Sequence, residues 1–372
     1  MGSKKLIYIV GGARPNFMKI APLIRALDNS EKLEYRIVHT GQHYDHDMND
    51  VFFKELGIPE PDYFMSAGGG SHSEQTSKIM LLFEKYCLDN RPDAVLVVGD
   101  VNSTLACSVV TKKLNIKLIH VEAGLRSNDK SMPEEINRIV TDSISDIYFV
   151  TESSGVDNLL VEGKSKNTIH FVGHVMIDNL FYQLDQLKNN VEVVKSTTDF
   201  KNGLNIAAKK YGVVTLHRPS NVDNKYVLNG IVEALNEISL EIPLVFPVHP
   251  RTKAKIEEFD LQISNRIVTI KPQSYMNFLS LWKDAALVLT DSGGLQEETT
   301  ALGVPCITIR ENTERPITVK EGTNVLSGTN KDIIIEKTFD VLNDVPTTSR
   351  RPEKWDGKAA IRIVSVLEKS FS

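Results

Sequence analysis

Short apolar runs alternate with longer amphipathic stretches along the whole chain. The β-branched runs of the first half, which predict strands, stand at residues 6–10, 34–39, 94–99, 117–121, 147–150 and 169–172. Helical periodicity fills several intervals, around residues 19–27, 48–56 and 103–113. The run AVLVVG at 94–99 is apolar without alternation, which is typical of a parallel strand buried on both faces. This rhythm predicts βαβ units and a doubly wound parallel sheet.

The same rhythm restarts after about residue 205. The second set of strand-like runs stands at 212–217, 244–248, 266–270, 286–290 and 305–309. The stretch between them, 183–208, is polar and rich in Lys, Asn and Ser, which fits either a linker or a helix followed by a long loop. We therefore expect two Rossmann-like domains, at 1–176 and 177–355. A C-terminal helix at 356–372 can pack back on the first of them.

Composition narrows the function classes. Lys and Arg number 43 against 48 Asp and Glu, a net charge of −5, so no bulk basic field for nucleic acid is expected. No apolar run approaches the roughly 18–20 residues that span a bilayer. The three cysteines, Cys87, Cys107 and Cys306, stand far apart, which indicates neither a disulfide framework nor a thiolate metal site. These features predict a cytoplasmic protein without a metal or membrane partner.

Polar residues follow the strands of the first half. GGARPNFMK, after the first run, brings Arg14 and Lys19 to the start of a helix, where anions are favoured. Asp100 comes directly after a buried run, where it can cap the next helix or serve in a site. Glu122 follows another apolar run, and a carboxylate there needs a partner, such as Arg126, or a function.

MPEEINR, at 132–138, reads as a helix start with Pro133 in its first turn. Glu134 and Arg138 stand four residues apart, so they can form an ordinary surface pair. The alternative is that they join the other strand-end groups on one rim. Carboxylates and cations together would suit proton transfer beside an anionic substrate.

The second half offers histidines and a glycine pair at its strand ends. His217 and His249 each end a strand, and either can be structural or can donate to a phosphate or sugar oxygen. LTDSGGLQEET, at 289–299, runs from a strand through glycines into a helix, which favours an anion cradle for a diphosphate. Glu298 in that helix can accept from a ribose diol. Tyr275 and Phe278 upstream can face a base, and Arg315 downstream can pair with phosphate.

Nine segments in this order resemble the non-hydrolysing UDP-N-acetylglucosamine 2-epimerases. They are GGARPNFMKIAP, TGQHYD, GDVNSTLA, HVEAGLRS, MPEEINR, TLHRPSN, PVHPRT, TDSGGLQEE and ENTERP, and they span about residues 6–330. The resemblance implies a glycosyltransferase-B type fold with the active site in the interdomain cleft. It also implies interconversion of UDP-N-acetylglucosamine and UDP-N-acetylmannosamine, with no nicotinamide and no metal. UDP would be eliminated to leave a 2-acetamidoglucal and then added back.

The resemblance also implies roles for individual residues. The catalytic positions would be Asp100, Glu122, Glu134 and His217. The substrate-binding positions would be Arg14, Lys19, Arg138, Gln273, Phe278, Ser292, Gly293, Gly294, Glu298 and Arg315. Candidate positions for a second, activating UDP-N-acetylglucosamine are Gln42, His43 and His249. A homodimer that supplies cell-surface polysaccharide precursors would fit the family.

Alternatives remain open for the substrate and the reaction. The loop SNDKSM at 127–132 is short, as in relatives that act on other UDP-2-acetamido sugars, including a 2,3-diacetamido uronic acid. A hydrolysing 2-epimerase would share the glycal intermediate but release free N-acetylmannosamine. A glycosyltransferase of the same fold, or a non-catalytic sensor of nucleotide sugars, would not need three carboxylates in this region.

Overall fold

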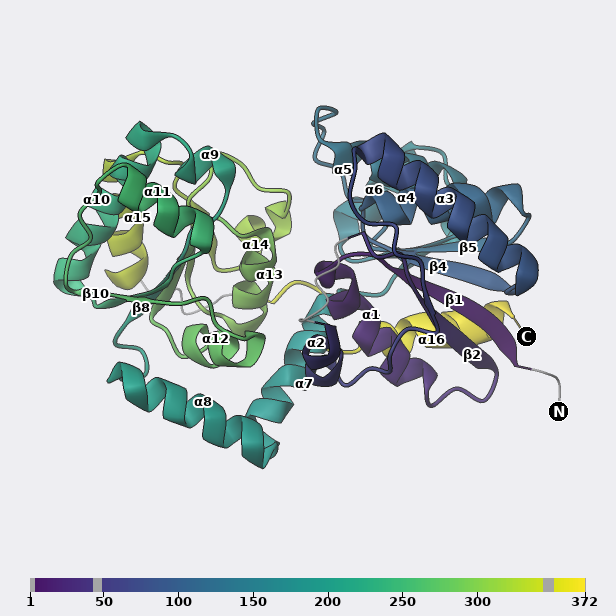
Figure 1. The fold of residues 1–372 in the computed structure, drawn as a ribbon, viewed down its shortest axis with the longest axis horizontal. Helices are drawn as coiled ribbons and strands as arrows, with labels where there is room; N and C mark the ends of the chain where they lie inside the picture. Colours follow the sequence, from purple (N-terminus) through teal and green to yellow (C-terminus); the bar gives the residue numbers. More distant parts are fainter. Residues whose placement is uncertain (1–3, 43–48, 344–350, 372) are drawn as a thin grey trace. The chain divides into compact units, whose positions relative to one another are not determined.

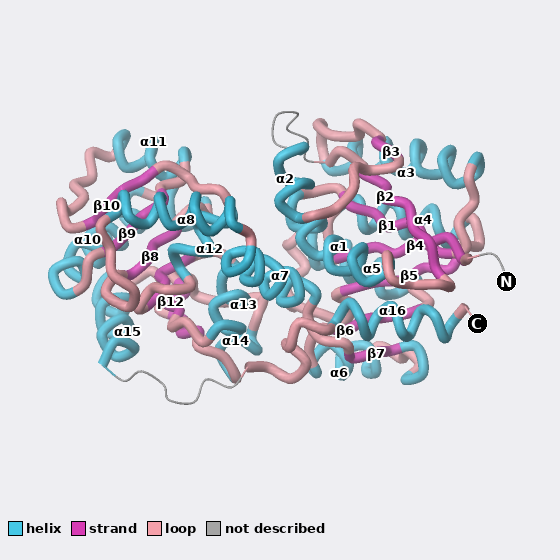
Figure 2. Tube along the Cα trace, turned by 90° about the horizontal axis from the view of Figure 1, so that it is seen from below, coloured by secondary structure: helices cyan, strands magenta, loops and turns pink. Residues whose placement is uncertain are grey.

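The computed structural model describes residues 4–42, 49–343 and 351–371. The chain divides into two compact units, the first formed by Met1–Asn179 with Glu353–Ser372 and the second by Leu180–Pro352. Each unit is built on one parallel sheet with helices on both faces (Figure 1, Figure 2). The fold class of two doubly wound α/β domains is confirmed. No helix in the described ranges is long and apolar enough to span a bilayer.

Unit 1 holds a seven-stranded sheet with the order β3-β2-β1-β4-β5-β6-β7. Its strands are β1 (Lys5–Gly11), β2 (Leu33–His39), β3 (Tyr63–Phe64), β4 (Ala94–Val98), β5 (Lys117–Val121), β6 (Ile147–Val150) and β7 (Ile169–Phe171). Its helices are α1 (Arg14–Leu27), α2 (Asn49–Leu56), α3 (His72–Asp89), α4 (Asn102–Lys113), α5 (Pro133–Ile144), α6 (Ser153–Val161), the 3-10 turn η1 (Lys166–Thr168) and α16 (Ala359–Ser370). Helices α3, α4 and α5 cover one face, and α1 and α16 pack together on the other (Figure 1).

Unit 2 holds a six-stranded sheet with the order β10-β9-β8-β11-β12-β13. Its strands are β8 (Gly212–Thr215), β9 (Leu244–Pro247), β10 (Ile267–Ile270), β11 (Leu287–Thr290), β12 (Cys306–Thr308) and β13 (Asn324–Leu326). Its helices are α8 (Val191–Leu204), α9 (Pro219–Val222), α10 (Lys225–Glu241), α11 (Pro250–Glu258), α12 (Tyr275–Trp282), α13 (Gly293–Leu302), α14 (Pro316–Lys320) and α15 (Lys331–Asn343). The chain passes from unit 1 to unit 2 within α7 (Val175–Asn189).

The central strands form because their apolar side chains are buried on both faces of each sheet. In β4 all five residues are buried, as the unbroken apolar run predicts. The chain is tightly packed where the sheet meets α4. A Cβ added at Gly12 would lie 2.0 Å from the Ser103 hydroxyl, so only glycine fits the turn between β1 and α1.

Two parts of the sequence interpretation change. The polar stretch 183–208 is neither a linker nor a long loop, because most of it lies in α7 and α8. Asn190 explains the break between these helices, since its side chain accepts from the backbone amides of Glu192 and Val193 and so caps α8. The edge strands β3 and β13, of two and three residues, were not predicted.

Candidate active site

Each sheet has a switch point where successive crossovers turn in opposite directions. In unit 1 it lies between β1 and β4, and in unit 2 between β8 and β11. Loops that leave the carboxyl ends of such neighbouring strands open a crevice, and ligands of doubly wound sheets bind there. In unit 1 these loops begin with Gly12 and Gly99, and in unit 2 they contain His217 and Asp291. The predicted site residues therefore fall at the edges of the sheets where ligand binding is expected.

A buried ion pair lies at the carboxyl ends of the unit 1 strands. Lys19 on α1 contacts the carboxylate of Glu122, which directly follows β5, and their side chains are 8% and 2% exposed. Glu122 has a φ of 71°, a left-handed conformation that is strained for a residue with a side chain. The backbone amides of Glu122 and Ala123 both donate to the Phe149 carbonyl and hold this conformation. The strained backbone fixes a carboxylate, opposite an ammonium, at the sheet edge.

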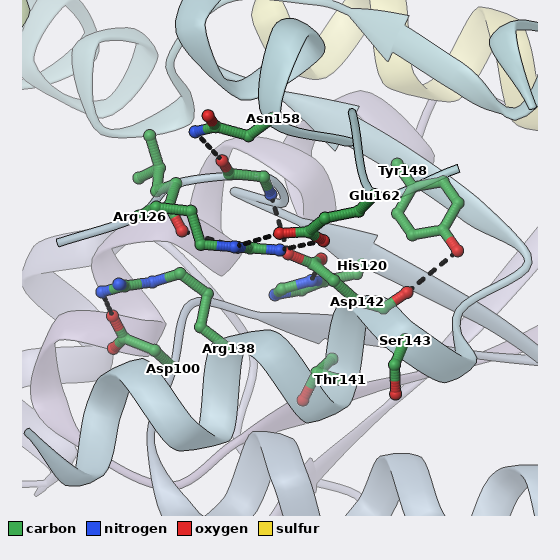
Figure 3. Close-up of polar contacts among 12 residues, drawn as sticks. Asp100, His120, Arg126, Arg138, Thr141, Asp142, Ser143, Tyr148, Asn158 and Glu162 are labelled. Carbon is green, nitrogen blue, oxygen red and sulfur yellow. Dashed lines mark hydrogen bonds and ion pairs between the residues drawn. The ribbon is translucent and has the colours of Figure 1, made fainter. Parts of the chain in front are cut away.

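Asp100 lies in the adjacent loop and is held by Arg138. The guanidinium of Arg138, buried on α5, donates to Asp100 Oδ2 at 2.6 Å (Figure 3) and also pairs with Glu135. Burial would raise the pKa of Glu135, but two loop amides and Arg138 lower it. A Cβ added at Gly99 would lie 3.2 Å from Lys19 Nζ, so the Asp100 loop passes beside the Lys19–Glu122 pair.

The local contacts considered for Asp100 and Arg138 do not form in the structure. Val101, not Asp100, is the N-cap of α4, and no side chain caps this helix. Arg138 is buried and turns toward Asp100 and Glu135, so its suggested surface pair with Glu134 does not form. Glu134 is exposed at the first turn of α5. Glu135 is thus the glutamate that holds Arg138 in place, whereas Glu134 is exposed to solvent.

The suggested pairing of Glu122 with Arg126 is also wrong. Arg126 bonds Asp142 Oδ2 at 2.8 Å and Glu162 at 2.7 Å, both from other elements (Figure 3). Because Lys19 comes from α1 rather than from the same loop, the partner of Glu122 could not be found by sequence proximity.

The remaining predicted residues of unit 1 lie around this edge. Arg14 is the exposed first residue of α1. Gln42 Oε1 accepts from the backbone amide and the hydroxyl of Ser103, at 3.1 and 2.7 Å, and so bonds the start of α4. His43 lies outside the described residues.

In unit 2, His217 is oriented by a buried aspartate. Its Nδ1 lies 2.9 Å from Asp291 Oδ1, and Asp291 is fully buried. Asp291 also accepts from the backbone amides of His217 and Arg218. Burial would raise the pKa of Asp291, but His217 and these amides lower it, so the carboxylate accepts from Nδ1–H. This contact engages Nδ1, so Nε2 is the nitrogen of this partly exposed ring that a ligand oxygen would meet.

The predicted anion cradle stands at the N-terminus of α13. Ser292 is the N-cap, and its side chain makes no capping bond to the helix. Gly293 and Gly294 begin the helix, where backbone amides lack intrahelical partners. A Cβ added at Gly293 would meet nothing closer than 3.9 Å, with Glu314 and Arg218 nearest. The space beside Gly293 that a side chain would occupy is therefore open.

Gly293→Ala is expected to weaken UDP binding by about tenfold, because its methyl group would enter the space that a diphosphate needs. The fold itself has room for the methyl group, so thermal stability should be unchanged or slightly raised. Gly230→Ala on α10, where a Cβ meets nothing within 4 Å, is the control. Calorimetric titration measures the UDP affinity of both variants. Equal affinities would contradict the prediction that Gly293 forms part of an anion cradle.

Glu298 lies within the same helix and is almost fully buried. The Tyr275 hydroxyl donates to its Oε1 at 2.6 Å. Burial raises the pKa of Glu298 to about 7, opposed by that hydrogen bond. Gln273 stands just before α12, and Phe278 lies within that helix. Both side chains are half-buried.

Arg315 and His249 have structural partners. Arg315 Nε pairs with Glu297 Oε1 at 2.6 Å, which ties the loop before α14 to α13. His249 is the N-cap of α11, where Nδ1 accepts from the Arg251 amide. Among the described residues, no group of three or more His, Cys, Asp or Glu side chains is arranged to hold a metal ion.

Sequence reasoning missed the buried acids that orient these groups. Asp291 precedes the glycine pair, and its position at the end of a buried strand was the available signal. Glu135 stands three residues before Arg138 on α5, so an i, i+3 spacing was the available signal for that pair. Asp142, by contrast, contacts His120 and Arg126 from outside its own helix, and no local spacing links it to them.

Two doubly wound sheets, with ionisable side chains at the switch point of one and a glycine pair at that of the other, have the two-domain α/β fold of the glycosyltransferase-B type. Residues 25–368 match the family model described as UDP-N-acetylglucosamine 2-epimerase. The chain belongs to this family.

Several relatives match over nearly the whole chain. The UDP-N-acetylglucosamine 2-epimerase of Methanocaldococcus jannaschii is 43% identical over 371 residues, 96% of this chain and 98% of the relative. Its crystal structure in complex with UDP-GlcNAc and UDP has a TM-score of 0.85, covering 98% of this chain and 99% of that one. A UDP-2,3-diacetamido-2,3-dideoxy-D-glucuronate 2-epimerase of Pseudomonas aeruginosa is 40% identical, over 89% of this chain and 90% of its own length.

Proposed function

We propose that this protein interconverts UDP-N-acetylglucosamine and UDP-N-acetylmannosamine without net hydrolysis. The observation that carries the proposal is the buried Lys19–Glu122 pair beside the Asp100 loop, at the switch point of unit 1. Epimerisation at C2 requires removal of a weakly acidic proton and its return on the other face, so it needs more than one positioned acid–base group. Membership of the 2-epimerase family supports the same reaction.

The proposed mechanism assigns acid–base chemistry to unit 1. UDP is eliminated across C1 and C2 to leave a 2-acetamidoglucal, and it then adds back as C2 gains a proton on the opposite face. Asp100, Glu122 and Glu134 supply the acid–base groups, and Lys19 and Arg138 hold two of these carboxylates in place. The departing UDP carries negative charge, so preorganised donors lower the barrier.

Unit 2 supplies the donors to UDP. The amides of Gly293 and Gly294 meet the diphosphate, with Ser292 at the helix cap. His217, oriented by Asp291, donates to a phosphate or sugar oxygen. Glu298 accepts from the ribose, and Gln273, Phe278, Arg14 and Arg315 complete nucleotide binding. A homodimer in the cytoplasm that supplies polysaccharide precursors belongs to the same proposal, as does a regulatory role for Gln42, His43 and His249.

A second candidate substrate is a UDP-2,3-diacetamido uronic acid. The specific observation in its favour is the 40% identity to the Pseudomonas aeruginosa relative that is named for that sugar. The same C2 chemistry would apply, so only the groups around the sugar would differ.

Proton NMR of UDP-N-acetylglucosamine with the protein in D2O tests the proposal. We expect a growing anomeric signal of UDP-N-acetylmannosamine and deuterium at C2 of both epimers, because the removed proton is replaced from solvent. Free N-acetylmannosamine would instead indicate the hydrolysing reaction. If the spectrum does not change, the same experiment with the diacetamido uronate decides between the second substrate and rejection of epimerase activity.

A further inference from the structure

His120 lies at the centre of a buried polar network that the proposed mechanism does not use. It is the fourth residue of β5 and is fully buried, as is Asp142 on α5. Its Nδ1 lies 2.7 Å from Asp142 Oδ1 (Figure 3), and its Nε2 lies 2.9 Å from the Gly99 carbonyl oxygen. The network connects α5, β5 and the loop that follows β4.

Both ring nitrogens of His120 face hydrogen-bond acceptors. The Gly99 carbonyl can only accept, so Nε2 must carry a hydrogen. Asp142 already accepts from Arg126 at 2.8 Å and from the Gly124 amide at 3.0 Å. Burial would raise the pKa of Asp142, but His120 and Arg126 lower it, so the carboxylate is ionised and accepts from Nδ1–H as well. Both nitrogens of the His120 ring therefore have a hydrogen-bond partner.

These contacts fix two loops that carry proposed catalytic carboxylates. Gly99 immediately precedes Asp100, and its carbonyl is held by His120 while its amide donates to the Val121 carbonyl at 3.0 Å. Glu122 follows directly after Val121. Gly99 has a φ of 65°, which glycine adopts without strain, so the contacts of its carbonyl and amide orient this peptide group. The separation of the two carboxylates therefore depends in part on this peptide group, together with the Arg138 contact to Asp100 and the Lys19 contact to Glu122.

We propose that His120, held by Asp142 and Arg126, is a positioning residue that sets Asp100 and Glu122 at the separation the reaction requires. The inference rests on the proposed epimerase function. His120 itself touches no reacting atom, since it is fully buried and both of its nitrogens are occupied. Residues that orient catalytic groups in this way affect turnover more than substrate affinity.

Two substitutions separate the two contacts of His120. In His120→Asn the amide nitrogen replaces Nδ1 and can still donate to Asp142, but it cannot reach the Gly99 carbonyl. In His120→Gln the amide nitrogen replaces Nε2 and can still donate to Gly99. Both variants remove the ring, so they serve as controls for each other.

We expect His120→Asn to lower kcat for C2 proton exchange by about 10–100-fold, with KM and UDP affinity within about twofold of wild type. His120→Gln should keep kcat within about threefold. A role in stability alone would lower the unfolding temperature of both variants and leave their kcat per folded molecule unchanged. Normal turnover in folded His120→Asn, or an equal loss of turnover in folded His120→Gln, overturns the proposal.

A crystal structure of His120→Asn supplies a readout that does not depend on activity. The Gly99 peptide should rotate and Asp100 should move by more than about 0.5 Å relative to Glu122. An unmoved loop would overturn the positioning role even if wild-type protein acts on another sugar. Absence of C2 exchange in the wild type would count against the proposed function, whereas this displacement would still decide the role of His120.

Discussion

Glu122→Gln is expected to lower the rate of C2 proton exchange in UDP-N-acetylglucosamine by about a thousandfold. The amide keeps the size of the side chain and a hydrogen-bond acceptor for Lys19, but it can neither accept nor deliver the C2 proton. UDP affinity should stay within about threefold, because the proposed phosphate donors belong to unit 2. Exchange is measured by NMR in D2O, and UDP affinity by calorimetry.

A second lysine–carboxylate pair in the same unit supplies the control. Asp146 bonds Lys112 at 2.7 Å and accepts from the Leu118 amide, at the amino ends of the strands. Asp146→Asn removes a comparable charge at the opposite edge of the sheet, so it should leave exchange within about twofold of wild type. A Glu122→Gln protein that retains a tenth of wild-type exchange would show that Glu122 has no acid–base role.

The central strands could be predicted because burial on both faces leaves an unbroken apolar run, as in β4. The edge strands β3 and β13 could not, because β3 has only two residues and the three residues of β13, NVL, include a polar one and stand between turn-forming residues. The edge strand β7, equally short, was predicted because its residues belong to the apolar run IHFV. The polar stretch that forms α7 and α8 was ambiguous for a related reason. Few of its side chains reach a core, and α8 buries only Thr197.

The site was predictable in position but not in its pairings. Asp100 and Glu122 stand at strand ends, and the carboxyl edge of a parallel sheet collects such residues. Their partners, Arg138 and Lys19, come from helices distant in the sequence. Local rules such as the i, i+4 pair therefore suggested wrong partners for Arg126 and Arg138. Contacts between elements depend on how helices are seated on the sheet, which spacing along the chain does not encode.

Lys19→Met is expected to destabilise unit 1 by about 3–5 kcal/mol, because it leaves the Glu122 carboxylate buried without its cation. Lys112→Met at the half-exposed Asp146 pair should cost less than about 1 kcal/mol. The chain has two tryptophans, Trp355 in unit 1 and Trp282 in unit 2. In a Trp282→Phe background, tryptophan fluorescence during urea unfolding reports on unit 1 alone.

The double variant Lys19→Met with Glu122→Gln separates the loss of the pair from the cost of an isolated charge. Neither remaining side chain is charged, so most of the stability lost in Lys19→Met should return. If the double variant is instead as unstable as Lys19→Met, the lysine stabilises the fold through its own packing, not by compensating Glu122. Recovery of stability without recovery of C2 exchange would show that this ion pair is kept for the reaction, since unit 1 can fold without it.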